Sequence, residues 1–358
     1  MEDSERRILY LCYYSGVPTG GIKKVYEHVD YLVGMGLNAY VVHNEAEYRY
    51  DWYQRASGIP ILYMDAVDNP LIQIDAEGKR TAFPPFSQYD ILVVPEPWAY
   101  KTYAYIEYHQ LFGVVFNQNA YYTFRELHHS IQPFAASREE SRVIPYLSPQ
   151  NLGTLVVSQE NKEYLTFAFP QMQCAVIRLS CNQKRFYFDA KNKKKQIAYM
   201  PRKCKLDALQ VVEILRVRDQ LQDWEFVPID NQPEEEVAKI MRESALFMSF
   251  SHREGFGLPP MEAMASGCIV IGYHGQAGKE FLKEPYGYPI TEGDLKTFIE
   301  TVERVAHTWE TQPEKSLQQA KSAADFIHSR YTQQNEKEDL HLAWQQILKK
   351  HSHALSFV

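Results

Sequence analysis

Short runs of apolar residues alternate along this chain with segments in which apolar residues recur every three or four positions. The first run, residues 7–14, is nearly continuous, as is usual for a strand covered on both faces of a parallel sheet. Apolar residues of the next segment, 22–32, are spaced as on one face of a helix, and residues 38–42 form another strand. Strand, helix and strand in this order are the repeating unit of a doubly wound sheet. The alternation therefore predicts an α/β fold with parallel sheets.

The alternation starts again after a polar, lysine-rich stretch at residues 182–196. Because this stretch lacks apolar periodicity, we predict that it links two Rossmann-like domains, 1–181 and 197–333, with a final helix within 334–358. Further strands are expected at 59–63, 91–95, 113–117, 155–158, 175–179, 196–200, 224–229, 246–250 and 268–272, and further helices at 98–112, from about 159, and at 207–219, 233–243, 295–309 and 313–331.

Composition narrows the possible partners and compartments. The net charge of −7 argues against a protein whose main partner is nucleic acid, because such proteins have basic surfaces. The five cysteines are scattered and odd in number, which indicates neither a disulfide framework nor a zinc site and favours a reducing cytosol. No signal peptide and no membrane span are expected from the apolar pattern. The predicted location is the cytoplasm, and peripheral contact with the inner face of a membrane stays open.

Two carboxylates, Glu254 and Glu262, stand eight residues apart around a Gly-Phe-Gly turn in the segment 251–267, SHREGFGLPPMEAMASG. The turn leads into the start of a helix, where backbone N–H groups attract phosphate and glycine lets the main chain approach it. A carboxylate accepts hydrogen bonds from two neighbouring sugar hydroxyls. The segment thus offers groups for both halves of a sugar nucleotide. The alternative is a strand–turn–helix connection with incidental surface acids.

This string resembles the E-x7-E signature of the retaining family-4 glycosyltransferases, which have the glycosyltransferase-B fold. The likeness includes Ser251, the Gly-Phe-Gly-Leu-Pro run and the Glu-Ala-Met-Ala-x-Gly run. It implies two Rossmann-like domains that face a cleft, with a final helix that returns to the N-terminal domain. By the same resemblance Glu262 binds ribose hydroxyls and Glu254 is a catalytic residue that faces the transferred sugar. The main chain implied to contact the donor is that of Gly255, Phe256, Gly257 and Leu258.

A basic loop follows the first strand expected in the C-terminal half. Members of the family place an Arg and then a Lys here to neutralise the diphosphate, whose negative charge grows as its bond to the sugar breaks. By resemblance Arg202 and Lys205 take these catalytic roles, although they stand closer together than usual. Lys203 is a rival for the lysine role and a further donor-binding candidate. The alternative is an ordinary basic helix start, which the helix dipole disfavours.

Three positions of the N-terminal half are assigned to substrate or donor binding. Gly20 and Gly21 end a loop after the first strand, at the edge of a parallel sheet where ligands bind, and the family has a glycine-rich loop at this place. Asn119 stands where many members carry a histidine near the sugar. Since an amide does not titrate, Asn119 either orients a sugar hydroxyl or satisfies the loop backbone. Glu96, at another strand end, is a further candidate to line the cleft.

Together these features predict a retaining glycosyltransferase that moves a sugar from a nucleoside-diphosphate-sugar donor to an acceptor hydroxyl, in glycan, polysaccharide or glycoconjugate synthesis. The C-terminal domain is expected to hold the donor. The N-terminal domain, including the irregular residues 121–149, is expected to choose the acceptor, which is a glycan, a lipid-linked molecule or a small molecule. No cofactor and no metal are expected, because basic residues neutralise the diphosphate and no metal-ligand spacing occurs. Two alternatives stay open: a sugar-nucleotide epimerase or phosphorylase of the same fold, and a non-catalytic sugar-nucleotide-binding protein.

Overall fold

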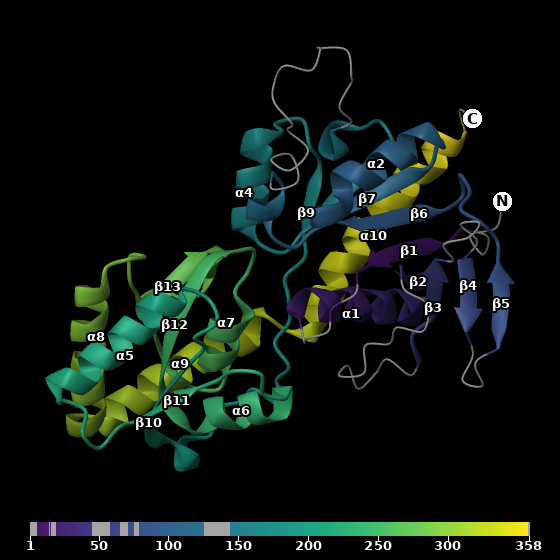
Figure 1. The fold of residues 1–358 in the computed structure, drawn as a ribbon. Coiled ribbons are helices and arrows are strands. Elements are labelled where there is room, and N and C mark those ends of the chain that lie inside the picture. Colours follow the sequence, from purple (N-terminus) through teal and green to yellow (C-terminus); the bar gives the residue numbers. More distant parts are fainter. Residues whose placement is uncertain are drawn as a thin grey trace. The chain divides into compact units, whose positions relative to one another are not determined.

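The computed structural model divides into two compact units. Unit 1 consists of residues 1–157, 161–177 and 337–358, and unit 2 of residues 158–160 and 178–336. Each unit is an α/β structure, as the alternation of the sequence predicts (Figure 1). The structure describes residues 6–13, 15, 19–44, 58–64, 71–74, 79–124 and 144–356.

The sheet of unit 1 has the strand order β5-β4-β3-β2-β1-β6-β7-β8-β9. Its pairs are parallel except at β4, which runs antiparallel to both β3 and β5. The order of the strands reverses between β1 and β6, which makes the carboxyl ends of these two strands the switch point of the sheet. The strands are β1 (Ile8–Cys12), β2 (Ala39–His43), β3 (Ile61–Met64), β4 (Leu71–Ile74), β5 (Arg80–Phe83), β6 (Ile91–Pro95), β7 (Phe112–Asn117), β8 (Asn151–Val156) and β9 (Cys174–Val176).

The helices of unit 1 follow the strands as crossover connections, and the last helix of the chain returns to this unit. Trp344 of that helix is buried, and its indole N–H donates to the hydroxyl of Tyr10 in β1 at 3.3 Å. Of the region 121–149, residues 125–143 lie outside the described residues. The helices are α1 (Gly20–Gly34), η3 (Glu96–Trp98), α2 (Ala99–Tyr108), η4 (Ala120–Tyr122), η5 (Pro145–Leu147), α4 (Gln159–Ala168) and α10 (Gln333–Leu355).

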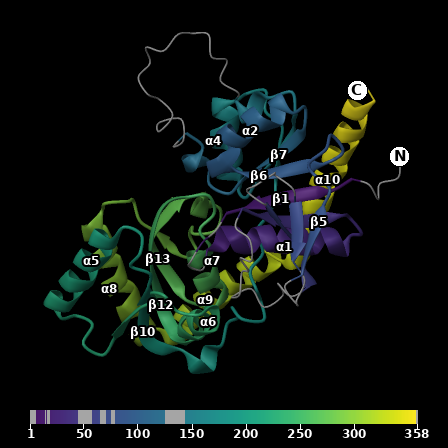
Figure 2. The same ribbon diagram turned by 45° about the vertical axis from the view of Figure 1, so that its right-hand side comes forward.

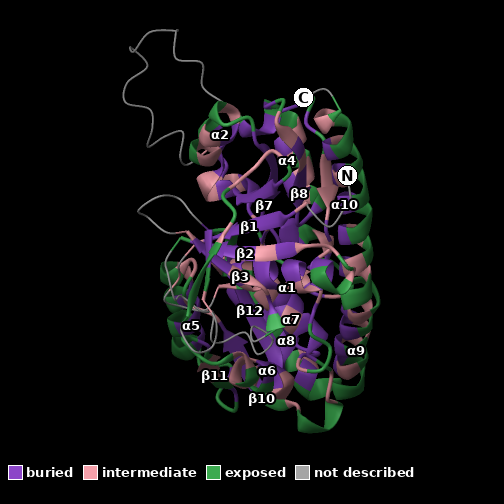
Figure 3. Ribbon diagram, turned by 90° about the vertical axis from the view of Figure 1, so that its right-hand side faces the viewer, coloured by how far each residue is buried: buried purple, intermediate pink, exposed green. Residues whose placement is uncertain are grey.

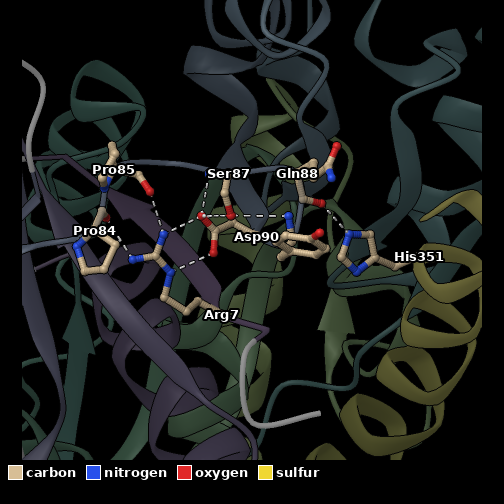
Figure 4. Close-up of polar contacts among 8 residues, drawn as sticks. Arg7, Pro84, Pro85, Ser87, Gln88, Asp90 and His351 are labelled. Atoms are coloured by element: carbon tan, nitrogen blue, oxygen red, sulfur yellow. Dashed lines mark hydrogen bonds and ion pairs between the residues drawn. The ribbon is translucent and has the colours of Figure 1, made fainter. Parts of the chain in front are cut away.

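A buried ion pair joins the segments that enter the two central strands of unit 1. Arg7 precedes β1 and Asp90 precedes β6, and the guanidinium donates to the carboxylate from Nε at 2.7 Å and from Nη2 at 2.5 Å (Figure 4). The guanidinium also donates to the carbonyl oxygen of Pro84 at 2.9 Å. On α10, a ring nitrogen of His351 lies 3.1 Å from the carbonyl oxygen of Gln88 in the same loop. Removing two charges from water costs free energy, and the hydrogen bonds that these two buried side chains form offset this cost.

Unit 2 has a parallel sheet with the order β11-β10-β12-β13-β14. Its switch point lies between β10 and β12. Helices α5 and α8 lie on one side of this sheet and α6 and α7 on the other (Figures 1 and 2). The elements are η6 (Ala190–Asn192), β10 (Lys194–Tyr199), α5 (Lys205–Arg218), β11 (Glu225–Pro228), α6 (Glu234–Glu243), β12 (Ser244–Glu254), α7 (Leu258–Ala265), β13 (Ile269–Gln276), η7 (Ala277–Glu280), β14 (Tyr288–Pro289), α8 (Leu295–Thr311) and α9 (Pro313–Arg330).

The core of each unit lies between its sheet and its helices. All five residues of β1 are buried, as are the first eight of β12, whereas α9 and α10 keep an exposed outer side (Figure 3). In unit 2 the ring of Phe250 stacks on that of Phe298 from α8 at 5.0 Å between centroids. Continuous apolar strands with amphipathic helices on both faces thus give the layered fold that the sequence predicts. No helix of the described residues is long and apolar enough to cross a membrane.

The stretch predicted as a linker, residues 182–196, is instead part of unit 2. Arg185 forms an ion pair with Glu234 at the start of α6. The ammonium of Lys193 donates to the carbonyl oxygens of Met241 at 3.1 Å and Ser244 at 2.6 Å. A cation at the carboxyl end of α6 satisfies helix carbonyls and complements the helix dipole. Lys193, together with Lys194 through its ion pair with Glu243, therefore attaches this stretch to α6.

Candidate functional site

The signature turn joins the end of β12, at Glu254, to the start of α7. Gly257 has a φ of 93°, in the left-handed region that favours glycine. Phe256 is 4% exposed, and its ring centroid lies 5.5 Å from that of Phe281 and 5.4 Å from that of Tyr331. Phe256 therefore anchors the turn in the core of unit 2, and it is the main chain of the turn that is left for a ligand.

Lys203 and Glu254 form an ion pair within unit 2. Lys203 lies in the loop after β10 and Glu254 ends β12, so the pair stands at the switch point of the sheet. Open α/β sheets bind ligands outside the carboxyl ends of the strands at such a point. The two side chains keep 33% and 19% of their surface exposed, which leaves both charges within reach of a ligand. The sequence assigns one of them to phosphate and the other to sugar, and it does not reveal that they touch.

The other predicted donor residues of unit 2 occupy the same edge of the sheet. Arg202 is exposed in the loop after β10, and Lys205 is the first residue of α5. Neither side chain has a hydrogen-bond or ion-pair partner among the described residues. Glu262 is half-buried on α7, and Leu258 is the first residue of that helix. Arg202, Lys203 and Lys205 thus bring three cations to the loop after β10 and the start of α5.

A cavity of about 270 Å³ opens at the end of the neighbouring strand β13. The register pairs Glu254 with Gln276, which places the cavity beside the signature turn. Gly275 has a φ of 60°, and a Cβ there would lie 2.8 Å from Ser251 Cβ and 3.1 Å from Glu254 Cγ. None of the residues that line this cavity is predicted from the sequence, although glycines after a buried strand are a signal of close backbone approach. They are Tyr273, His274, Gly275, Gln276, Lys279, Ile290, Thr291 and Glu292.

His274 lines this cavity with a neutral ring. Its Nδ1 accepts a hydrogen bond from the backbone N–H of Gln276 at 2.9 Å. Burial, assisted by the charge of Lys279, lowers the pKa of His274 below its usual range. A neutral imidazole that accepts at Nδ1 carries its proton on Nε2, which is then a donor. The cavity wall therefore combines an imidazole N–H and an ammonium with the carboxylate of Glu292.

In unit 1, Gly20 and Gly21 are the first two residues of α1. Thr19 caps this helix by accepting from the backbone N–H of Ile22 at 3.3 Å. A Cβ on Gly21 would lie 3.2 Å from the side-chain oxygen of Gln118, which follows β7. Glycine therefore leaves room between the start of α1 and the end of β7, at the carboxyl edge of the sheet.

Asn119 is 6% exposed and caps the short helix η4. Its side-chain oxygen accepts from the backbone N–H of Tyr121 at 3.1 Å. Of the two roles that the sequence leaves open for this amide, the structure displays the hydrogen bond to the loop backbone.

Glu96 directly follows β6 and is 5% exposed. Its carboxylate accepts from the backbone N–H of Gln118 at 3.0 Å. Burial raises the pKa of Glu96 to about 7, and hydrogen bonds from the main chain, including those of Gln118 and Asn119, act in the opposite direction. A carboxyl that titrates near neutrality thus stands at the switch point of unit 1.

Part of unit 2 matches a known protein family. Residues 225–324 match the family model described as glycosyl transferases group 1, a range that includes Glu254, Glu262 and the cavity. An alpha-1,6-glucosyltransferase of Actinobacillus pleuropneumoniae is 45% identical over 80 residues, which are 22% of this chain and 24% of that protein. A human GDP-Man:Man(3)GlcNAc(2)-PP-Dol alpha-1,2-mannosyltransferase is 29% identical over 134 residues, 36% of this chain and 26% of that protein. The chain thus spans about a quarter of the length of these curated relatives.

Solved structures resemble almost the whole chain. Sucrose-phosphate synthase of Thermosynechococcus elongatus has a TM-score of 0.64 at 14% identity, over 96% of this chain and 100% of that chain. HepE of Anabaena, solved with UDP and glucose, has a TM-score of 0.60 at 13% identity, over 97% of this chain and 100% of that chain. Likeness at such identities shows the fold, which is the glycosyltransferase-B fold. The predicted fold class and the resemblance to glycosyltransferases are confirmed.

Proposed function

We propose that this protein is a retaining glycosyltransferase that moves a sugar from a nucleoside-diphosphate-sugar donor to an acceptor hydroxyl. The observation that carries the proposal is the Lys203–Glu254 pair at the switch point of unit 2, next to the glycine turn and the cavity. The match of residues 225–324 to the glycosyl transferases group 1 supports it.

The donor diphosphate is proposed to bind at the loop after β10. Arg202 and Lys205 are exposed and unpaired among the described residues, so they can approach phosphate without breaking a contact. Lys203 exchanges its partner: the diphosphate takes the place of Glu254, and the freed carboxylate accepts hydrogen bonds from the sugar. Glu262 on α7 takes the ribose hydroxyls. That HepE was solved with UDP and glucose supports a donor of this class.

Chemistry at this site consists of breaking the bond between the anomeric carbon and the diphosphate oxygen. The negative charge that grows on the diphosphate is stabilised by Arg202, Lys203 and Lys205, which act more strongly in the transition state than in the ground state. The departing phosphate oxygen takes the proton of the acceptor hydroxyl, which attacks from the same face, so that the anomeric configuration is retained. The cations of this loop neutralise the diphosphate, and this route needs no metal. Unit 1 is proposed to select the acceptor.

Nucleotide binding tests the role of Glu262. Calorimetry with UDP, GDP and ADP identifies the diphosphate that binds, and Glu262→Ala is expected to weaken its affinity by about tenfold or more, the cost of a lost charged hydrogen bond. Glu300→Ala, at an exposed glutamate of α8, is the matched control. Unchanged affinity in Glu262→Ala would show that this residue does not bind the ribose.

Turnover separates the proposed activity from its alternatives. Release of nucleoside diphosphate only when an acceptor is present, and a product with the donor's anomeric configuration by NMR, are expected. An isomerised sugar nucleotide would indicate an epimerase, and a requirement for inorganic phosphate would indicate a phosphorylase. Binding without turnover would indicate a binding protein.

Arg202→Ala is expected to lower turnover about 100-fold, the cost of one charge-stabilising donor. Arg216→Ala, at an exposed arginine of α5, is the control.

A further inference from the structure

Three potential metal ligands from separate segments of unit 2 meet near the Lys203–Glu254 pair. Cys204 precedes α5, His252 lies near the end of β12, and Glu292 lies in the loop after β14. One ligand atom of each lies within 4.8 Å of the other two. Within the described part of the chain, no other group of three or more His, Cys, Asp and Glu side chains comes this close.

The surroundings of the Cys204 thiol are anionic. Burial, followed by the charges of Glu292, Asp207 and Glu254, raises the pKa of Cys204 to about 11, and only Lys203 acts in the opposite direction. The thiol is therefore protonated at neutral pH as long as no cation is present. A bound metal ion reverses this balance, because it is attracted by the carboxylates and displaces the proton of a coordinating thiol.

The three ligand atoms lie within 4.8 Å of one another, so small side-chain rotations bring them to the spacing of a metal site. In a tetrahedral zinc site the bond lengths put neighbouring ligand atoms about 3.5 Å apart. In the free protein Nδ1 of His252 lies 2.5 Å from a carboxylate oxygen of Glu292, so these two atoms must separate by about 1 Å to admit an ion. The exposed fractions of the two side chains, 44% and 43%, leave room for each of them to turn when the ion enters. Three protein ligands leave a fourth position open to water.

We propose that Cys204, His252 and Glu292 form a binding site for a thiophilic divalent cation, with zinc as the metal that best fits this set. A thiolate and an imidazole select zinc over magnesium or calcium, which prefer oxygen ligands. Each ion bound releases one proton from the thiol to solvent. The ion ties together the loop after β10, the end of β12 and the loop after β14. Its ligands are not the cations assigned to the diphosphate, although Cys204 lies between Lys203 and Lys205, and the existence of the metal site does not depend on the proposed sugar transfer.

Cobalt titration of the chain tests this site, because a thiolate bound to Co²⁺ gives a charge-transfer band in the near ultraviolet. After removal of metal with a chelator, one equivalent of Co²⁺ is expected to produce this band, and Zn²⁺ is expected to abolish it. Cys204→Ser should eliminate the band, and His252→Ala should weaken Co²⁺ affinity by at least about 10–100-fold, the loss known for ligand-supporting groups. Binding should tighten as the pH rises, because the thiol must lose its proton.

The matched control is Cys174→Ser, at a half-buried cysteine of β9 in unit 1, which should keep the band. Circular dichroism of each variant shows whether it is folded. The proposal fails if stoichiometric Co²⁺ gives no thiolate band, or if the band survives Cys204→Ser. Since the readout is spectroscopic, a missing band leaves the proposed transferase standing, and missing transferase activity leaves the metal site standing.

Discussion

At the scale of single residues, the charged side chains of the candidate site differ in the groups that they contact. Lys203 contacts a carboxylate, whereas its neighbours Arg202 and Lys205 contact no charged group among the described residues. In unit 1 the carboxyl of Glu96 is buried and accepts a hydrogen bond from the backbone N–H of Gln118. These differences in environment decide which side chains are ready for a ligand and which must first exchange a contact.

Removing the charge of Lys203 should separate catalysis from stability. Because the pair with Glu254 is partly exposed, Lys203→Met is expected to change the free energy of unfolding by less than about 1 kcal/mol. Turnover of the sugar donor should fall about 100-fold, since a group that stabilises the leaving diphosphate is lost. Urea unfolding and steady-state kinetics measure the two effects. Lys239→Met, at an exposed lysine paired with Glu236, is the control, and near-normal turnover in Lys203→Met would exclude the phosphate role.

The buried Glu96 should make unit 1 less stable as the pH rises. Its folded pKa of about 7 lies above the value of about 4.3 for an unfolded glutamate, so between these values the folded chain holds a proton that the unfolded chain has lost. Stability is therefore expected to fall by roughly 3–4 kcal/mol across this window and then to level off. Glu96→Gln, which keeps an acceptor for the N–H of Gln118, should remove this fall.

Urea unfolding of the full chain as a function of pH measures the effect of Glu96. Glu163→Gln, at an exposed glutamate of α4, should follow the wild-type curve. If the pH profiles of the wild type and Glu96→Gln run parallel, the carboxyl of Glu96 is not protonated in the folded state.

At the scale of elements, the site depends on where strands end. Glu254 ends β12 and pairs in register with Gln276 at the end of β13, so the signature turn and the cavity share one edge of the sheet. Tyr273 of β13 donates from its hydroxyl to Asp207 of α5 at 2.9 Å, which links this edge to the helix after the basic loop. Three elements are thereby held at the position where the donor is proposed to bind.

A side chain at Gly275 should disturb this edge. Gly275→Ala puts a Cβ 2.8 Å from Ser251 Cβ at a φ of 60°, so we expect a loss of about 1–3 kcal/mol in the free energy of unfolding. Nucleotide affinity should weaken as well, because Glu254 is displaced. Gly34→Ala, at the exposed end of α1 with open space around it, is the control and should be neutral or slightly stabilising. Chemical denaturation and calorimetry measure both, and wild-type values for Gly275→Ala would show that the edge adapts.

At the scale of the whole molecule, α10 connects the two units in sequence. Its first residues, through Glu336, belong to unit 2, and the rest belongs to unit 1. Glu336 accepts from the backbone N–H of Ser180 at 3.1 Å, and Trp344 contacts Tyr10. The final segment of the chain therefore completes the core of the unit that contains its first strand.

Truncation of Trp344 should affect the two units unequally. Trp344→Ala removes a large buried side chain from unit 1 and is expected to cost about 3–5 kcal/mol of stability. Nucleotide affinity, a property assigned to unit 2, should stay close to that of the wild type while the protein is folded. Scanning calorimetry and nucleotide titration measure these quantities, with Leu342→Ala at an exposed position of α10 as the control. Loss of affinity at low temperature would show that unit 1 contributes to the nucleotide site.

Most elements could be located from the sequence, because the periodicity of apolar residues reflects local geometry. The strand expected at 91–95 coincides with β6, and the helix expected at 313–331 differs from α9 by one residue. The hairpin of β4 and β5 was missed, since these short strands carry no long apolar run. From its sequence the stretch 182–196 resembles a linker, because no local pattern shows that Lys193 reaches the carbonyls of α6.

By itself the sequence determined the alternation of strands and helices, the glycosyltransferase-B fold that it resembles, and the turn that carries Glu254. These features can be predicted from local patterns, that is, from each residue and its neighbours in the sequence. Only the tertiary structure decided that Lys203 meets Glu254, 51 residues away. It also decided that Cys204, His252 and Glu292 converge. The physical reason is that such contacts depend on strand order and register, which bring together segments that no local pattern relates.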